Sequence, residues 1–295
     1  MKELKVANRT FAWGARTYVM GILNITPDSF SGDGLADGND YVTAALAQAH
    51  DFAQAGADIL DVGGESTRPG AEPVNAEEEK ARVLPVIKAI ASELNLPISI
   101  DSYKAEVVDA ALNASAHLVN DVWGLRADTE LAALVAARNV PIILMHNRSN
   151  PVNADLRERL GGRYVGVEYE NLIEDVKREL MDSVTIAKDA GINDEMIILD
   201  PGIGFGKTVE QNLELLDRCG EIRELGYPLL VGPSRKSFIG YTLDLPPDRR
   251  VEGTAAAVAV AIARGADIVR VHDVQVMARV AKMTDAITRR SIDGK

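Results

Sequence analysis

Short apolar runs alternate with amphipathic stretches along nearly the whole chain. Each run is rich in Val, Ile and Leu and shows little alternation with polar residues, a pattern typical of strands that are buried on both faces of a parallel sheet. The runs lie at 19–24, 58–62, 97–101, 117–121, 141–146, 196–200, 228–232 and 267–271. The pattern therefore predicts eight buried strands.

The stretches between these runs have the spacing of helices. Apolar residues recur every three or four positions, so that each helix buries one face; one such set is Val42, Ala45, Leu46, Ala49 and Phe52. Asn75 with Glu78, and Thr208 with Gln211, have the spacing of a capping box. In that motif, side chains satisfy the free N–H groups of the first helical turn.

Eight strand–helix units in 295 residues favour a (β/α)8 barrel, with a doubly wound open sheet as the alternative. Before the first strand, residues 4–17 are predicted to form an N-terminal β-hairpin that turns near Trp13-Gly14. Polar connections at 147–166 and 243–252 are long, but no low-complexity stretch or linker divides the chain. We therefore expect a single domain over residues 1–295.

Every predicted strand ends in polar residues. In chain order these are Asn24, Asp61, Asp101, Asn120-Asp121, His146-Asn147, Asp200, Ser234-Arg235-Lys236 and Arg270 with His272. Any one of them alone is explained as the start of a loop or as part of a structural ion pair. In a (β/α)8 barrel, however, the carboxyl ends of all strands meet at one face, where active sites are found. The complete set favours a shared pocket.

Two of these residues, Asp101 and Asp200, follow apolar stretches, which places their carboxylates deep at a strand tip. An unpaired charge is costly there. One suitable partner is a neutral ligand with several N–H donors, such as an amino-pyrimidinone ring. The other is an internal ion pair with Lys236 or Arg270. The residues alone leave both partners open.

Glycine-rich segments follow three of the predicted strands. The segment 201–207, Pro-Gly-Ile-Gly-Phe-Gly-Lys, precedes a helix and could offer N–H groups to a ligand, although a tight strand-to-helix turn explains it equally well. It is not a Walker A motif, because Pro201 occupies the position of that motif's first glycine. Segments 26–34 and 63–70 have the composition of mobile lids, or of ordinary surface loops.

Composition and charge remove several classes of function. The chain has 46% hydrophobic and 26% charged residues, which is globular composition, and no apolar run approaches the roughly 20 residues of a membrane helix. The single Cys219 excludes an internal disulfide, and the four histidines lack zinc-binding spacing. A net charge of −12 opposes binding to nucleic acid or to anionic membranes. With no signal segment visible, we expect a cytoplasmic protein.

Taken together, the motifs resemble those of bacterial dihydropteroate synthases. The matching strings are 20–31 (MGILNITPDSFS), 61–70 (DVGGESTRPG), 100–102 (IDS), 120–121 (ND), 200–207 (DPGIGFGK), 234–236 (SRK) and 270–272 (RVH). The resemblance implies a reaction in which p-aminobenzoate displaces pyrophosphate from 6-hydroxymethyl-7,8-dihydropterin pyrophosphate, with Mg²⁺. The family is commonly dimeric, so a homodimer is expected.

The resemblance also assigns roles to individual residues. Those that match the pterin pocket are Asp101, Asn120, Asp200, Lys236 and Arg270. Those that match the pyrophosphate site are Asn24, Arg68, Arg270 and His272, with Asn24 also near the metal. Those that match positions around p-aminobenzoate are Phe30, Thr67, Pro69, Phe205 and Ser234. The residues expected to be catalytic are Lys236, Arg270, His272 and Asp101.

The family is thought to break the C–O bond first, since an electron-rich dihydropterin can stabilise a positive charge on its methylene group. Catalysis then consists of stabilising the departing pyrophosphate and holding the pterin cation away from water. No general base is required. This suits a set of residues that contains no evident activated nucleophile.

Two positions depart from the family pattern. Ser31-Gly32-Asp33-Gly34 stands where the family usually has Ser-Asp-Gly-Gly, and Asn147 follows His146 where the family often has methionine. We therefore assign no role to Asp33 or to His146-Asn147. The alternatives to a synthase are a corrinoid-type pterin-binding methyltransferase, against which the 234–236 motif and the lack of an Asp-x-His motif argue, and a non-catalytic pterin-binding homologue.

Overall fold

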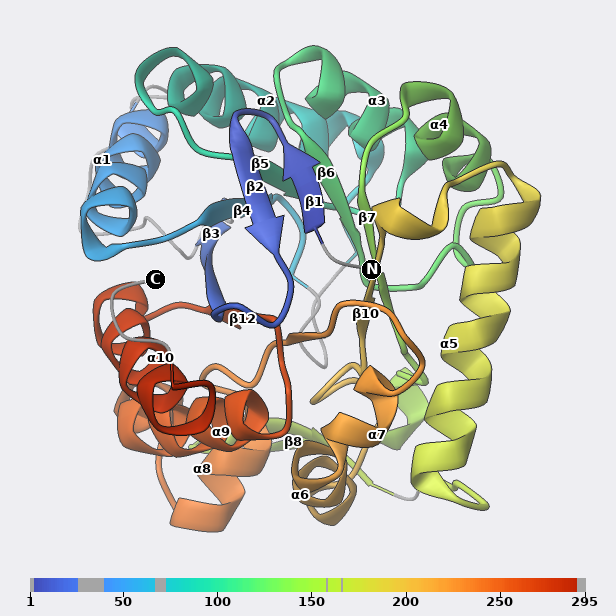
Figure 1. The fold of residues 1–295 in the computed structure, drawn as a ribbon, viewed down its shortest axis with the longest axis vertical. Coiled ribbons are helices and arrows are strands. Elements are labelled where there is room, and N and C mark those ends of the chain that lie inside the picture. Colours follow the sequence, from blue (N-terminus) through green and yellow to red (C-terminus); the bar gives the residue numbers. More distant parts are fainter. Residues whose placement is uncertain (1–2, 26–39, 67–72, 158, 166, 291–295) are drawn as a thin grey trace.

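The centre of the fold is a closed parallel barrel, seen in a computed structural model that describes residues 3–25, 40–66, 73–157, 159–165 and 167–290 (Figure 1). Eight strands follow one another in the order β10-β7-β6-β5-β4-β3-β12-β11. A parallel bridge between Leu199 and Leu229 brings the two ends of this order together. Consecutive strands are neighbours throughout, so the (β/α)8 prediction is confirmed and the doubly wound alternative is wrong.

The predicted strands and the observed strands agree to within two residues at each end. The barrel strands are β3 (Tyr18–Asn24), β4 (Ile59–Gly63), β5 (Ile98–Asp101), β6 (Leu118–Asp121), β7 (Ile142–Met145), β10 (Ile197–Asp200), β11 (Leu230–Val231) and β12 (Ile268–Val271). β11 is the shortest, because Pro228 and Pro233 on either side of it lack the N–H group that a ladder needs.

Helices surround the barrel on its outside (Figure 1). They are α1 (Asp40–Ala55), α2 (Ala76–Glu93), α3 (Ala105–Asn113), α4 (Leu131–Arg138), α5 (Leu172–Asp189), α6 (Val209–Asp217), α7 (Cys219–Arg223), α8 (Ser237–Leu243), α9 (Val251–Ala263) and α10 (Val274–Thr288). The predicted capping box of Thr208 and Gln211 begins α6, and the Asn75 side chain accepts from Glu78 N at the start of α2. None of the described helices is long and apolar enough to cross a bilayer.

Side chains on the inner face of the barrel form two layers of different chemistry. The layer nearer the amino ends is apolar and consists of Met20, Ile59, Leu118, Ile143, Ile198, Leu230 and Ile268. Side chains along a strand alternate between the two faces, so a residue two positions further on also points inward. In four strands that next inward residue is polar: Asp61, Asn120, Asp200 and Arg270. The alternation of side chains along each strand therefore places polar and charged groups directly next to the apolar layer.

An antiparallel hairpin covers the amino-terminal mouth of the barrel (Figure 1). It consists of β1 (Glu3–Val6) and β2 (Arg9–Ala12), and Leu4, Val6 and Phe11 pack against the apolar layer. The predicted hairpin is confirmed, but the predicted turn is wrong. The chain turns at Ala7-Asn8, because the alternation of buried Leu4 and Val6 with exposed residues ends there. Trp13-Gly14 instead leads from β2 to β3.

A second hairpin lies within the long polar connection after β7. Its strands, β8 (Ala154–Arg157) and β9 (Gly161–Tyr164), pair antiparallel. The Tyr241 hydroxyl of α8 donates to Gly161 O at 3.2 Å, and the Arg163 guanidinium lies 4.5 Å from the centre of the Tyr241 ring. The sequence does not predict this hairpin, because few of its residues are apolar and its contacts are to a distant helix.

At the amino ends of the strands, buried aspartates join neighbouring segments. Asp267 is 1% exposed and accepts hydrogen bonds from Gly14 N (3.0 Å), Leu229 N (3.0 Å) and Arg223 Nε (2.7 Å). These bonds satisfy backbone groups at the start of the barrel that no strand partner reaches. Stability at this end of the barrel therefore depends on a few carboxylates.

We expect Asp267→Ala to lower the free energy of unfolding by about 3 kcal/mol, because it leaves Leu229 N–H buried without an acceptor and removes the partner of Arg223. Urea denaturation followed by circular dichroism measures the change. Asp217→Ala is the matched control: it breaks an exposed ion pair with Arg264 and should cost less than about 1 kcal/mol. Equal losses in the two variants would contradict this role for Asp267.

Candidate active site

Arg270 extends from β12 into the polar layer of the barrel, between two carboxylates. Its Nε donates to Asp61 Oδ2 at 2.5 Å, and its NH2 group pairs with Asp101. The side chain of Arg270 is 18% exposed and that of Asp61 is completely buried. Burial opposes the charge, but the two carboxylates raise the pKa of Arg270 above its usual value. The guanidinium is therefore a fixed cation at the centre of the site.

Asp61 also holds a second residue of the predicted pterin pocket. Asn120 Nδ2 donates to Asp61 Oδ2 at 3.1 Å, while Asp61 Oδ1 is buried and has no hydrogen-bond partner among the described residues. The family resemblance assigns no role to Asp61. The sequence does contain a signal for its place in the site: Asp61 lies two residues after Ile59, which faces the inside of the barrel, so Asp61 faces inward as well. We conclude that Asp61 orients both Arg270 and Asn120.

For Asp101, the structure contains the internal ion pair that the sequence left open. Its partner is Arg270, and the Asp101 side chain is 12% exposed. Burial raises the pKa of Asp101 to about 7, with Arg270 opposing the rise and Asp61 adding to it. A buried carboxyl group beside a specific charged partner is common at functional sites.

Asp200 and Lys236 form the opposite side of the site. Asp200 is 5% exposed, and its Oδ1 accepts from Gly202 N at 2.7 Å. Lys236, at the start of α8, donates to Ile203 O, and its Nζ lies 4.1 Å from the centre of the Phe205 ring. Burial raises the pKa of Asp200, and it lowers the pKa of Lys236 to about 7. The glycine-rich segment after β10 is thus held between the two.

Ser234 and His272 lie together on neighbouring loops, after β11 and β12. His272 N donates to Ser234 Oγ at 3.1 Å, and His272 Nδ1 is 3.0 Å from the same oxygen. Arg235, whose φ is +56°, joins the two loops through Asp273, with Nε 2.9 Å from Oδ2. A left-handed non-glycine residue is strained, and such strain persists only where surrounding contacts hold it. The sequence motifs do not predict this second connection.

The remaining predicted residues are placed less fully. Asn24 ends β3, and its Cα partner in β4 is Gly63, which is in turn the partner of Asp101. Asn24 therefore lies at the same end of the barrel as the ion pairs. Phe30, Asp33, Thr67, Arg68 and Pro69 lie outside the described residues.

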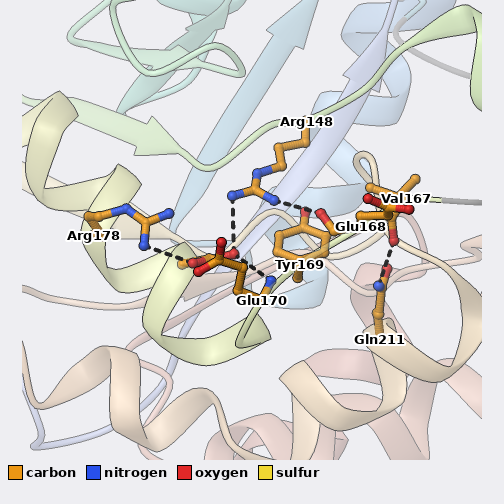
Figure 2. Close-up of a pocket in the computed structure, with 8 residues that line it drawn as sticks. Arg148, Val167, Glu168, Tyr169, Glu170, Arg178 and Gln211 are labelled. Atoms are coloured by element: carbon orange, nitrogen blue, oxygen red, sulfur yellow. Dashed lines mark hydrogen bonds and ion pairs between the residues drawn. The ribbon is translucent and has the colours of Figure 1, made fainter.

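A cavity of about 670 Å³ opens between the loop after β7 and the first turns of α5 and α6 (Figure 2). Its lining residues are Arg148, Val167, Glu168, Tyr169, Glu170, Asp175, Arg178 and Gln211. Arg148 pairs with Asp175 at 3.3 Å and lies 4.1 Å from the centre of the Tyr169 ring, and Arg178 pairs with Asp175 at 2.8 Å. Because these charged groups pair with one another, we assign no ligand to this cavity.

Comparisons with known proteins give one consistent family. The pterin binding enzyme family matches residues 20–272. The dihydropteroate synthase of Clostridium beijerinckii is 51% identical, over 97% of this chain and 100% of its own length. The structure of the Clostridium difficile dihydropteroate synthase in the presence of pteroic acid has a TM-score of 0.85 and 46% identity, and the match covers 94% of this chain and 98% of that one.

The structure of the Xanthomonas albilineans dihydropteroate synthase with 4-aminobenzoic acid has a TM-score of 0.86 and 39% identity, with 99% of each chain covered. These matches extend along nearly the whole chain, and their full length includes the strand ends at which the polar residues meet. The chain therefore belongs to the dihydropteroate synthase family of pterin-binding enzymes.

Proposed function

We propose that the polar layer at the carboxyl end of the barrel binds 6-hydroxymethyl-7,8-dihydropterin pyrophosphate and presents its methylene carbon to p-aminobenzoate. The chain is a transferase of the dihydropteroate synthase family, which makes 7,8-dihydropteroate and pyrophosphate for folate synthesis. The roles that we propose for individual residues rest on one observation. Arg270 contacts Asp61 and Asp101, and Asp61 contacts Asn120, next to the apolar layer inside the barrel.

The pterin ring suits this layer because the chemistry of its edges is complementary. Its amino and ring N–H groups are donors, and the carboxylates of Asp101 and Asp200 are acceptors. Lys236 and Asn120 can donate to the ring carbonyl and ring nitrogens. Arg270, held by Asp61, would lie against the ring and toward the pyrophosphate. Such a neutral ring fills a site in which charges of both signs are already paired.

The pyrophosphate must be held by local cations, because the chain as a whole carries a charge of −12. Arg270 and His272 project from the same strand and its following loop, and Arg68 is a further candidate from outside the described residues. Hydrogen-bond donors that face the leaving group stabilise the charge that develops as the C–O bond breaks. Asp101 and Asp200 are themselves largely buried, so a pterin cation that contacts them would also be shielded from water.

The family implies Mg²⁺, and Asn24 suits this ion. Among the described residues no group of three or more His, Cys, Asp or Glu could hold a metal by itself. Magnesium, however, is often held by one or two protein oxygens together with substrate phosphates and water. The Asn24 amide would supply one such oxygen. When bound, the ion would neutralise charge on the departing pyrophosphate.

The p-aminobenzoate position is proposed to adjoin Phe205 and Ser234, which flank Lys236 on two loops. Phe205 offers an aromatic face and Ser234 a hydroxyl group. Phe30, Thr67 and Pro69 are proposed to complete this position. The amine then attacks the methylene cation that remains after the pyrophosphate departs. Once the C–N bond has formed, the amine passes its proton to water or to the released pyrophosphate.

We expect the purified chain to release pyrophosphate only when both substrates are present. His272→Ala should lower the turnover number by about 100-fold, as removal of one donor to a developing anion does, and should weaken product inhibition by pyrophosphate. A coupled pyrophosphate assay measures both. His50→Ala is the control, because His50 pairs with Glu93 on the surface. Release without p-aminobenzoate, or unchanged pyrophosphate inhibition in His272→Ala, would contradict the proposal.

We also propose a homodimer that forms through α10. Val276, Val280, Met283 and Ile287 are spaced along one face of this helix, and Val276, Met283 and Ile287 are 39%, 61% and 67% exposed. Val260 of α9, which packs beside α10, is 39% exposed. A contiguous apolar face of this kind is common at interfaces between subunits.

The double substitution Met283→Lys and Ile287→Lys should convert the dimer to a monomer, because it places two charges in the contact. Light scattering coupled to size-exclusion chromatography gives the mass. Ile186→Lys, on α5, is the control and should leave the mass unchanged, since Ile186 is exposed on a different helix. A dimer that survives the double substitution would rule out this interface.

A further inference from the structure

Lys207, at the end of the glycine-rich segment, is enclosed in the protein with 2% exposure. Its Nζ has three neighbours at hydrogen-bond distance: His146 Nδ1 at 2.9 Å, Gly202 O at 2.9 Å and Phe205 O at 3.0 Å. None of the roles proposed above uses Lys207 or His146. A buried lysine is costly unless its partners match its protonation state, so those partners identify the state.

The partners of His146 determine its tautomer. His146 Nε2 is 3.0 Å from Glu179 Oε2, and Arg148 Nε donates to Glu179 Oε1 at 3.0 Å. Burial opposes the charge on Glu179, but His146 and Arg148 bring its pKa below the usual range, so Glu179 is a carboxylate. The hydrogen therefore lies on His146 Nε2. Burial, with Lys207 nearby, lowers the pKa of His146 to about 3, and the neutral ring leaves Nδ1 as an acceptor.

All three neighbours of Lys207 Nζ are then acceptors. An ammonium group donates three hydrogen bonds, whereas a neutral amine donates only two and would leave one acceptor facing its lone pair. Burial lowers the pKa of Lys207 well below its usual value, and Asp200 and Glu179 act against that change. The hydrogen-bond geometry favours the charged form. Lys207 is thus a cation and Glu179 an anion, and the neutral imidazole of His146 bridges them.

This ammonium is linked to Asp200 through one residue. Gly202 O accepts from Lys207, while Gly202 N donates to Asp200 Oδ1 at 2.7 Å. A Cβ on Gly202, whose φ is +71°, would lie 1.8 Å from His146 O, so the turn packs directly on the end of β7. The other cations that act on the Asp200 carboxylate are Lys236 and Arg270. Of these three cations, Lys207 is the one that donates hydrogen bonds to the carbonyl groups of Gly202 and Phe205 in the turn.

We propose that Lys207 is a positioning residue of the pterin site: its ammonium group, bound by carbonyl groups of the turn at 202–205, keeps Asp200 ionised as an acceptor of pterin N–H groups. The proposal rests on the function proposed above for Asp200. His146 contacts the ammonium directly, and Glu179 contacts the other nitrogen of the same imidazole. His146, to which the family motif gives no role here, therefore acts through Lys207.

The test is the affinity for 6-hydroxymethyl-7,8-dihydropterin, a ligand whose ring N–H stays protonated over this range, measured by titration calorimetry from pH 6 to pH 9. In Lys207→Met, which keeps the length of the side chain, we expect affinity below the pH midpoint of binding to fall by about tenfold, because loss of a nearby cation raises the pKa of a buried carboxyl by about one unit or more. The loss should shrink as the pH rises, because a higher pH ionises Asp200 even without Lys207. The pH midpoint of binding should thus move upward relative to the unaltered protein.

A double-substitution cycle separates charge from shape. In Asp200→Asn, the further change Lys207→Met should alter affinity by less than about threefold, since the two effects share one carboxylate. A purely structural role would give a loss that is independent of pH and equal in both backgrounds, and either result would overturn the proposal.

Glu179→Gln provides a second variant in case Lys207→Met does not fold. Because it removes the negative partner of the ammonium, it should also move the pH midpoint upward, whereas Glu174→Gln, an exposed change on the same helix, should not. An unchanged midpoint in Glu179→Gln would overturn the proposal. If the unaltered protein fails to bind the pterin, the proposed function itself fails, and the role of Lys207 fails with it.

Discussion

A guanidinium group inside a barrel must be paired, and the pairing of Arg270 with Asp61 and Asp101 is the constraint on which the site depends. Removing one partner of a buried ion pair leaves an uncompensated charge, which costs several kcal/mol. Asp61 also orients Asn120, so loss of Asp61 would affect both Arg270 and Asn120. One cation therefore fixes the positions of three polar residues on three other strands.

The same constraint explains how an acidic protein can hold an anionic substrate. The net charge of −12 is spread over the molecule, whereas Arg270, Lys236 and Lys207 are gathered where the strands end. Each has acidic or carbonyl partners that satisfy it in the absence of substrate. A pterin ring and a pyrophosphate can exchange for some of these contacts without leaving a charge unpaired, which limits the cost of desolvation on binding.

The barrel and the position of its site could be predicted from the sequence because both follow from local pattern. The apolar runs predict the strands. Side chains two positions apart in a strand point to the same side, so the residues two positions after the inward-facing Ile59, Ile198 and Ile268 also point inward. These residues are Asp61, Asp200 and Arg270. The resemblance then named the residues that we propose for the pterin pocket. These are properties of short segments and of motifs, which need no knowledge of distant contacts.

The contacts that the sequence could not give join residues far apart in the chain. Asp61 and Arg270 are separated by 209 positions, and His146 and Lys207 by 61. The hairpin of β8 and β9 is likewise held by α8 rather than by an apolar pattern of its own. The turn of the first hairpin was misplaced because glycine at position 14 is a stronger turn signal than Ala7, which nevertheless adopts a left-handed φ of 52°.

The central claim, that the layer around Arg270 is the pterin pocket, is tested most directly by a crystal structure of this chain with a bound pterin. The account predicts that the ring lies on this layer, with its N–H edge within hydrogen-bond distance of the Asp101 and Asp200 carboxylates and with Arg270 still bound to Asp61. A pterin bound in the cavity beside Arg148 and Tyr169, with the polar layer of the barrel unchanged, would contradict it.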